Sequence, residues 1–418
     1  MNSPRVLLSA YQCGPGLGSV SQIGWEWYSR LAQKLPVTLV THIRNRPALE
    51  QAGATLNTVP EVVYIDTEWF AGPLYRLASW LFPRSEHPVF LISSMDFYLY
   101  DWVALKTLRR LRKQGASWDI VHQATPVSPL AATRLYKLAI PLILGPWNGG
   151  LRSPSEYPEI MSAESSWVYP IRKLGLWVER LIGSYRNARI ILTATLSTRA
   201  GIPPEFGPKC IAMLENGVDL EIFKPSDWPD PPSQEKPLNI LFVGRLLPFK
   251  GVPMLLEALA RLQIPFHLTI VGTGSEEGHL RTLAESLPIK GKVEFKGALP
   301  LCEVAKQMAL AHVFCLPSVR ESGGGVLLEA MATARPVIAL GYGGPAEIVD
   351  DDIGRLIPST GRESVIEEIA KTLANVYESP EHWRQRGLTG RQRVEQHYAW
   401  PVKIDAAIAL YRQCQEKP

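Results

Sequence analysis

Short apolar segments alternate with helical patterns along almost the whole chain, and this alternation constrains the fold more than any other feature. Because each segment is bounded by turn residues and followed by a helical pattern, the arrangement predicts parallel sheets with helices on both faces. The alternation occurs twice, once in each half of the sequence. The predicted strands are 5–10, 37–42, 62–66, 119–124, 141–145 and 189–195, then 238–244, 267–272, 293–297, 313–317, 336–340 and 355–357.

The length of the chain fits two domains. With 418 residues, each domain is large enough to have a core of its own. The stretch richest in proline is 226–237, which reads as a surface loop or linker, so we place the junction between about 200 and 237. The predicted domains are residues 1–205 and 206–397, and a C-terminal helix over 398–418 is expected to pack back on the first domain.

Composition excludes several classes of protein. The formal net charge is only +4 and no basic stripe is present, so a nucleic-acid partner is not expected. The sequence contains no run of about 18 apolar residues, so we expect no membrane-spanning helix. The five cysteines show no C-x-x-C spacing, and the first residues run straight into a strand without a signal peptide. We therefore expect a cytoplasmic protein with reduced thiols.

An aromatic segment over 67–113 departs from the alternation and ends in a basic run over 106–113. Aromatic residues beside lysine and arginine are typical of a helix that lies on an anionic membrane surface. The alternative is a helix with an ordinary solvated basic face and core aromatics, and we favour this alternative slightly. A peripheral position on the cytoplasmic face of a membrane remains the second expectation.

Two carboxylates frame a glycine-rich loop in the second half. Glu321 follows the predicted strand 313–317, and Glu329 lies eight positions later inside a predicted helix over 326–333. Between them, residues 322–325 read Ser-Gly-Gly-Gly. Glycine lets backbone N–H groups approach a ligand closely at a helix N-terminus. The carboxyl end of a strand is where open α/β sheets bind ligands, so this arrangement favours a polyhydroxylated ligand.

A second loop, over 244–251, carries two cations after a buried strand. Arg245 and Lys250 precede a predicted helix over 252–262, a position suited to holding a diphosphate. Solvated loop charges are the alternative, equally common for such residues.

Other motifs are weaker. The turn over 14–19 has the position of a phosphate-binding loop but lacks the G-x-G-x-x-G spacing, and the turn over 272–275 is a second glycine-containing turn. His122, alone on a predicted strand, reads as structural before other evidence is considered. The acidic turn over 350–352 reads as a solvated turn rather than as a metal site.

Taken together, these segments resemble the family-4 retaining glycosyltransferases, within glycosyltransferase group 1. The resemblance covers most of residues 205–400 and rests on 215–225, 244–251, 268–274 and 318–349. In the first domain it is thinner, resting on 16–24, His122 and 141–146. It implies the GT-B architecture, an α/β fold of two facing Rossmann-like domains.

The resemblance also implies roles for individual residues. Arg245 and Lys250 would bind the donor diphosphate and stabilise the leaving group, without a metal or other cofactor. Glu321 would face the donor sugar, and Glu329 would bind the ribose hydroxyls. The other residues implied to bind the donor are Gly18, Gly244, Gly272, Gly274, Ser322, Gly323, Gly324 and Gly325, and His122 would contact the transferred sugar.

The implied function is retaining transfer of a hexose from a nucleotide diphosphate sugar to a hydroxyl acceptor, either a membrane lipid or a glycan precursor. The Gly323-Gly324-Gly325 run departs from the side chains common in the family, so the donor base and sugar stay open among UDP, GDP and dTDP donors. Two alternatives remain, a GT-B nucleotide-sugar epimerase and a non-catalytic protein that binds nucleotide sugars or glycans.

Overall fold

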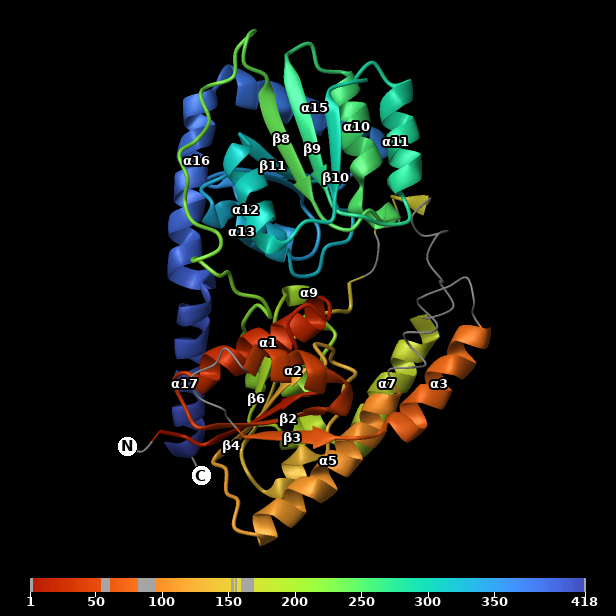
Figure 1. Cartoon of the computed structure of the whole chain (residues 1–418), viewed down its shortest axis with the longest axis vertical. Coiled ribbons are helices and arrows are strands. Elements are labelled where there is room, and N and C mark those ends of the chain that lie inside the picture. The colour runs from red at the N-terminus through yellow and green to blue at the C-terminus, as the bar shows by residue number, and fades with distance from the viewer. Residues whose placement is uncertain are drawn as a thin grey trace. The chain divides into compact units, whose positions relative to one another are not determined.

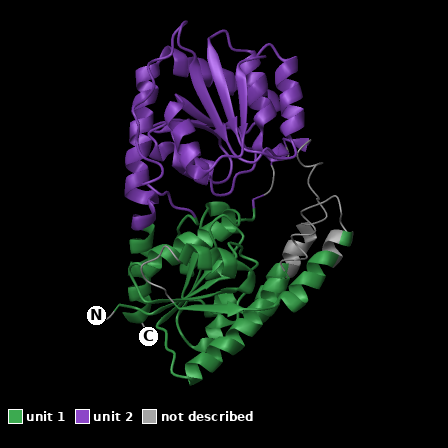
Figure 2. Cartoon of the chain, viewed as in Figure 1, with its two compact units in different colours: residues 1–150, 165–215, 403–418 green, residues 151–164, 216–402 purple. Residues whose placement is uncertain are grey.

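The chain divides into two compact units (Figure 2). In this computed structural model, residues 3–53, 61–81, 95–151, 154, 156–158 and 169–416 are described. Unit 1 contains residues 1–150, 165–215 and 403–418, and unit 2 contains residues 151–164 and 216–402. The chain therefore passes from unit 1 to unit 2 after residues 150 and 215, and it returns to unit 1 after residues 164 and 402.

Unit 1 is built on a seven-stranded sheet in which every pairing is parallel (Figure 1). The strand order is β3-β2-β1-β4-β5-β6-β7. The central strands are buried along their whole length, because helices cover both faces of a parallel sheet. The strands are β1 (Val6–Ala10), β2 (Val37–His42), β3 (Val62–Ile65), β4 (Ile120–Thr125), β5 (Leu142–Trp147), β6 (Ile190–Thr193) and β7 (Cys210–Ala212).

Unit 2 is built on a six-stranded parallel sheet with the order β10-β9-β8-β11-β12-β13. In both sheets the order runs outward from the first strand and then reverses, which is the doubly wound Rossmann pattern. The strands are β8 (Leu238–Val243), β9 (Phe266–Val271), β10 (Val293–Gly297), β11 (Val313–Leu316), β12 (Val337–Leu340) and β13 (Gly354–Ile357).

Helices connect the strands in both units. In unit 1 they are α1 (Ser19–Ala32), α2 (Arg46–Gly53), α3 (Glu68–Leu81), α5 (Asp96–Lys113), α7 (Tyr169–Ile182), α8 (Ser184–Asn187) and α9 (Leu196–Ala200). In unit 2 they are α10 (Val252–Ala260), α11 (Glu277–Ser286), α12 (Leu301–Leu310), α13 (Gly325–Ala332), α14 (Pro345–Ile348), α15 (Arg362–Glu378) and α16 (Pro380–Arg393). The last helix, α17 (Trp400–Glu416), belongs to unit 1 from Lys403 onward.

All twelve predicted strands are present, with ends shifted by at most two residues. The sequence missed β7, which has three residues and an incompletely buried pattern. Such a short and partly exposed strand has no periodic signal that distinguishes it from a loop.

The proline-rich stretch 226–237 lies within unit 2 and has no helix or strand. Its first residues are held by Arg335, a guanidinium that is almost completely buried. Arg335 donates hydrogen bonds to the carbonyl oxygens of Asp227 at 2.8 Å and Met308 at 3.0 Å. Because these bonds fix the stretch to its own unit, it is a surface segment of unit 2 rather than the connection between units.

The aromatic segment over 67–113 divides between the core and the surface. On α5, Phe97 and Tyr100 are buried in the core of unit 1. On α3, by contrast, Trp69 is 68% exposed and Trp80 is 76% exposed. Phe82 and Phe90, which belong to the same predicted segment, lie outside the described residues. The expectation of core aromatics thus holds for Phe97 and Tyr100, whereas Trp102 on α5, which is 45% exposed, and the aromatic side chains of α3 face solvent.

The described helices include none that is both long enough and apolar enough to cross a bilayer.

Candidate functional site

Four loops meet at the carboxyl edge of the unit 2 sheet, because all its strands run in the same direction. They follow β8 (244–251), β9 (272–276), β11 (317–324) and β12 (341–344), and we call them the edge loops. Every residue of unit 2 that the sequence predicts to act on a donor lies in these loops or in α13.

Backbone hydrogen bonds tie the edge loops to one another. The Val319 N–H donates to the Phe249 carbonyl oxygen at 3.0 Å and joins the loops after β11 and β8. The Leu246 N–H donates to the Thr273 carbonyl oxygen at 2.9 Å and joins the loops after β8 and β9. Since these bonds are between backbone groups, they fix the loop paths whatever side chains the loops carry.

Two glycines allow an even closer approach between loops. Gly251 has a φ of 68°, and a Cβ at this position would collide with the Pro317 carbonyl oxygen. Gly343 has a φ of 70°, and its Cβ would collide with the Glu321 carbonyl oxygen, which also accepts a 2.9 Å hydrogen bond from the Gly344 N–H. Glu321 is therefore positioned by the loop after β12 as well as by its own strand.

Close approach between loops also explains why two of the predicted donor-binding residues are glycine. A Cβ on Gly272 would collide with the Gly244 carbonyl oxygen, and a Cβ on Gly274 would collide with the Leu246 carbonyl oxygen. Close packing between loops thus accounts for the residue type at both positions. Contact of Gly244, Gly272 and Gly274 with a donor stays a prediction.

Lys250 and Glu321 form an ion pair between the loops after β8 and β11. Their side chains are 14% and 17% exposed, so the pair is largely shielded from water. The Phe249 ring lies beside it, with the Lys250 ammonium 5.8 Å from the ring centroid and the Arg320 guanidinium 4.7 Å from it. Sequence reasoning missed Arg320, although its position directly before Glu321 was the available signal.

Arg245 contributes the exposed charge of this edge. Its side chain is exposed, and none of the ion pairs within the described residues includes it. Lys250 and Arg245 lie in the same loop, so one cation is held by a carboxylate while the other faces solvent. An anion of higher charge than a carboxylate, such as a diphosphate, would be attracted to both.

The glycine run leads directly into α13. Gly324 has a φ of 64° at the start of this helix, a left-handed conformation that suits glycine. Gly323 and Gly324 are buried, and their N–H groups donate to no acceptor within the described part of the chain. Ser322 and Gly325, on either side, are partly exposed. The run therefore has backbone donors beside Glu321 that lack an acceptor among the described residues, and their contact with a donor sugar stays a prediction.

Glu329 lies on the second turn of α13 and is only partly accessible to solvent. Burial raises the pKa of its carboxyl group to about 7. The desolvation that disfavours its charge also strengthens any hydrogen bond that the carboxylate makes to a ligand hydroxyl.

In unit 1, Gly18 lies where a ligand could approach it. It is the exposed residue directly before α1, with a φ of 104°, in the loop that follows β1. Apart from its two chain neighbours, the described residues place no atom within 4 Å of the position that its Cβ would take. Gly24, further along α1, packs against the Gln12 carbonyl oxygen instead, so glycine there serves helix packing.

His122 is buried, and the structure corrects the expectation that it contacts a sugar. It is 0% exposed on β4, and protein groups bond both ring nitrogens. Nδ1 lies 2.7 Å from the Tyr411 hydroxyl on α17, and Nε2 lies 2.6 Å from the Gly145 carbonyl oxygen. The ring also packs edge-on against Trp27, and burial lowers its pKa to about 4. His122 is a neutral histidine that fastens α17 to the sheet.

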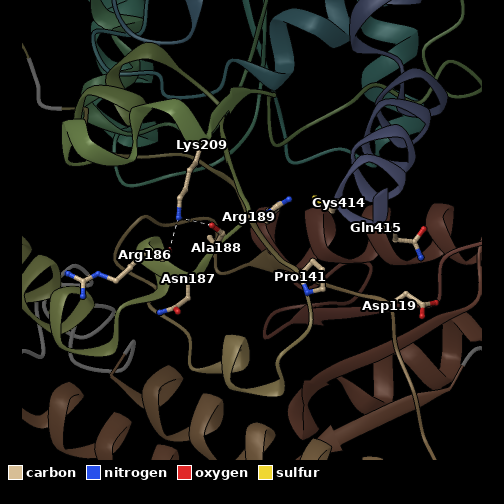
Figure 3. A pocket seen from close by; sticks show the side chains of 9 residues that line it. All are labelled: Asp119, Pro141, Arg186, Asn187, Ala188, Arg189, Lys209, Cys414 and Gln415. Atoms are coloured by element: carbon tan, nitrogen blue, oxygen red, sulfur yellow. Dashed lines mark hydrogen bonds between the residues drawn. The ribbon is translucent and has the colours of Figure 1, made fainter. Parts of the chain in front are cut away.

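A cavity in unit 1 opens at the opposite edge of that sheet (Figure 3). It measures about 900 Å³, and Asp119, Pro141 and Arg189 lie on it just before β4, β5 and β6. Lys209 donates hydrogen bonds to the carbonyl oxygens of Arg186 at 2.7 Å and Ala188 at 2.9 Å. This lysine therefore closes a loop, and the cavity lies at the amino ends of the strands, away from the edge where open sheets bind ligands.

A protein with two doubly wound parallel sheets, one of them carrying cations and carboxylates on its carboxyl-edge loops, belongs to the GT-B class of folds. Residues 224–389 match the model of the family described as glycosyl transferases group 1. This part of the chain is a glycosyltransferase group 1 domain.

Individual glycosyltransferases are also similar to this chain in sequence. A D-inositol 3-phosphate glycosyltransferase of Segniliparus rotundus is 33% identical over 221 residues, which are 49% of this chain and 47% of that protein. An MMP alpha-(1->4)-mannosyltransferase of Mycolicibacterium hassiacum is 25% identical over 317 residues, 74% of each chain. The chain spans about half the length of the D-inositol 3-phosphate glycosyltransferases that it matches.

A solved structure extends the likeness in fold to nearly the whole chain. Anabaena Alr3699/HepE, solved in complex with UDP and glucose, superposes with a TM-score of 0.63 at 17% sequence identity. The match covers 98% of this chain and 99% of that one. At this level of identity the likeness concerns the fold alone.

We predict that Glu329→Gln makes the chain more stable at pH 8 but not at pH 5. The folded-state pKa of about 7 lies above the usual pKa of 4.5 for a glutamate carboxyl group, so the folded chain holds the proton more tightly. Wild-type stability should therefore fall as pH rises from about 4.5 to 7, whereas the glutamine variant should lack this fall. The difference at pH 8 should be on the order of 1–3 kcal/mol in the free energy of unfolding, measured with urea.

Glu285→Gln, at an exposed position on α11, is the control and should leave the pH dependence unchanged. If the Glu329→Gln variant kept the wild-type fall in stability, burial of Glu329 would not be the cause of it.

Proposed function

We propose that this chain is a glycosyltransferase that moves a hexose from a nucleotide diphosphate sugar to a hydroxyl acceptor. One observation carries the proposal: Arg245 and the Lys250–Glu321 ion pair lie together on the edge loops, within a domain of the glycosyl transferases group 1 family. The relatives named above as glycosyltransferases support transfer of a sugar, and the UDP and glucose complex of a protein with this fold supports a nucleotide-linked donor.

The two cations would act on the leaving group. Breaking the bond between a sugar and a diphosphate builds negative charge on the departing phosphate, so fixed positive charges favour the transition state over the ground state. Arg245 is exposed and would interact with this charge directly. Lys250 would interact with the phosphate and less strongly with Glu321. We propose that these side chains supply the positive charge that a metal ion supplies in other transferases.

The two carboxylates would then divide the donor between them. Glu321, partly released from Lys250, would accept hydrogen bonds from sugar hydroxyls, with the Gly323 and Gly324 N–H groups beside it. Glu329 would accept hydrogen bonds from the ribose. Retention of configuration would follow from attack of the acceptor on the face that the phosphate leaves, with a phosphate oxygen accepting the proton of the acceptor hydroxyl. Such a step requires no enzymic nucleophile.

Two substitutions separate these roles. Lys250→Ala should weaken donor binding and turnover together, since it removes charge that acts in both states. Glu321→Gln should lower turnover by about 10² to 10³ while leaving nucleotide affinity within a few fold, because the hydrogen bonds concerned are made to the reacting sugar. Lys290→Ala on the surface of unit 2 is the matched control. Nucleotide release from UDP, GDP and dTDP sugars is the measurement, with affinity from calorimetry.

Several outcomes would contradict this account. Equal and small effects of Lys250→Ala and Glu321→Gln would remove the assigned roles. Exchange of solvent hydrogen into the sugar ring without any acceptor would indicate an epimerase. Tight binding of a nucleotide sugar without turnover of any donor would indicate a binding protein.

We also propose that the protein contacts an anionic membrane surface through its exposed aromatics. Trp69 and Trp80 on α3 are joined by Trp177 and Leu181 on α7, which are 57% and 66% exposed. Four large apolar side chains kept in water are costly unless a partner covers them, and tryptophan suits the boundary of a bilayer. A lipid acceptor would then be within reach of the protein.

Trp69→Ala and Trp80→Ala should each lower co-sedimentation with vesicles that contain phosphatidylserine, by about three-fold or more. Leu310→Ala on α12, where Leu310 is 62% exposed, should leave it unchanged. If wild-type binding is absent, or ignores both anionic lipid and salt, the membrane proposal is wrong.

A further inference from the structure

A second cavity lies at the carboxyl edge of the unit 1 sheet, and its volume is about 570 Å³. The short 3₁₀ helix η1 (Ile43–Asn45), which follows β2, forms one wall together with the start of α2. The helix α3, which follows β3, forms the opposite wall, and the first residue of α5 closes the base. Among the described residues, all that line the cavity belong to unit 1. The cavity is large enough for a hexose ring with a substituent.

One face of α3 is shaped to receive a ring. Glu68, Ala71, Gly72 and Tyr75 line the cavity at the spacing i, i+3, i+4 and i+7, so they follow one another along a single helix face. The two small residues in the middle leave space. At Gly72, the nearest atom to an added Cβ is Oε2 of Glu68, at 3.9 Å. Tyr75, which is 57% exposed, places an aromatic ring at one end, where it can stack on the apolar face of a sugar.

A fixed carboxylate lies at the base of the cavity. The side chain of Asp96 is 2% exposed. It accepts hydrogen bonds from the Tyr11 hydroxyl at 2.6 Å, the Thr67 hydroxyl at 3.0 Å and Arg44 Nη2 at 3.1 Å. Because three donors from three different loops hold Asp96, its orientation is set before any ligand arrives. A preorganised polar group of this kind binds a hydroxyl without losing side-chain freedom.

The charge of the cavity favours a neutral ligand. Arg44 is bound between two carboxylates, since its guanidinium also contacts Glu68 Oε1 at 3.0 Å. The neighbouring His42 is neutral at pH 7, because burial and the nearby Arg44 lower its pKa to about 4. Two carboxylates and one guanidinium leave a net negative charge, which repels a phosphate or a phospholipid head group. Carboxylates and a guanidinium can bind sugar hydroxyls. An exposed tyrosine can cover one face of a sugar ring.

We infer that this cavity binds the hydroxyl acceptor, and that the acceptor presents a neutral sugar ring to it. The part of this inference that names the ligand as the acceptor rests on the proposed function. The sugar-binding site itself can be detected without any donor. Glu68 and Arg44 would hold ring hydroxyls at the rim, and Tyr75 would cover one face of the ring. These residues bind and position the acceptor, and no chemical step is assigned to them.

Binding of methyl glycosides of glucose, galactose and mannose to the full chain tests this inference, with saturation-transfer NMR as the readout. At least one glycoside should bind to the wild-type protein. Gly72→Leu fills the cavity and suits a helix, so it should abolish the signal without lowering the melting temperature. Glu68→Gln should weaken binding by about ten-fold, because it removes a charged hydrogen-bond acceptor.

Matched controls exist for both substitutions. Gly278→Leu places the same side chain on an exposed helical position of unit 2, and Glu50→Gln breaks a surface ion pair with Arg46 on α2, outside the cavity. Both should leave glycoside binding unchanged. Nucleotide binding to unit 2, measured in the same variants, should be unaffected by all four.

Three results would overturn the inference: binding of none of the glycosides, glycoside binding that survives Gly72→Leu, or inorganic phosphate competing for the same signals. None of these results depends on turnover of a nucleotide sugar. Failure of the acceptor site is therefore distinguishable from failure of the proposed transferase activity.

Discussion

The close packing of backbone against backbone at the carboxyl edge of the unit 2 sheet is the constraint on which the candidate site depends. Gly251 touches the carbonyl of Pro317, and Gly343 touches the carbonyl of Glu321, at separations that leave no space for a Cβ. The loops between these contacts have little freedom to move. As a result, the Lys250–Glu321 pair and the N–H groups of Gly323 and Gly324 are arranged before a ligand binds, which is the condition for electrostatic catalysis.

The charges at this edge form a site that is stable when empty and still attractive to an anion. Pairing with Glu321 compensates the largely buried Lys250, whereas Arg245 is solvated and needs no partner. A diphosphate would compete with one carboxylate for Lys250 and gain Arg245 as well. Glu329 adds a cost to the empty protein, since burial raises its pKa to about 7. Such a group lowers the stability of the folded protein but would make a stronger hydrogen bond to a ligand.

Much of this could be predicted from the sequence, because strand periodicity and the order of motifs are local signals. The twelve strands and the convergence of Arg245, Lys250 and Glu321 follow from strand ends in a parallel sheet. The local pattern indicates a structural His122, and the family resemblance replaces that interpretation with a sugar contact. The partner of His122 could not be predicted, since Tyr411 lies 289 positions away and its position depends on how α17 packs. The cavity around Asp96 could not be predicted either, because the hydrogen bonds of Asp96 join loops that are distant in the sequence.

Hydrogen–deuterium exchange of the full chain, with and without the nucleoside diphosphates UDP, GDP and dTDP, tests the central claim most directly. The claim is that the edge loops after β8 and β11 bind the donor diphosphate through preset backbone and charged groups. It predicts that at least one nucleotide slows exchange in peptides covering 244–251 and 318–326, with the second peptide including Gly323 and Gly324. Protection confined to other segments, or no protection by any of the three nucleotides, would contradict it.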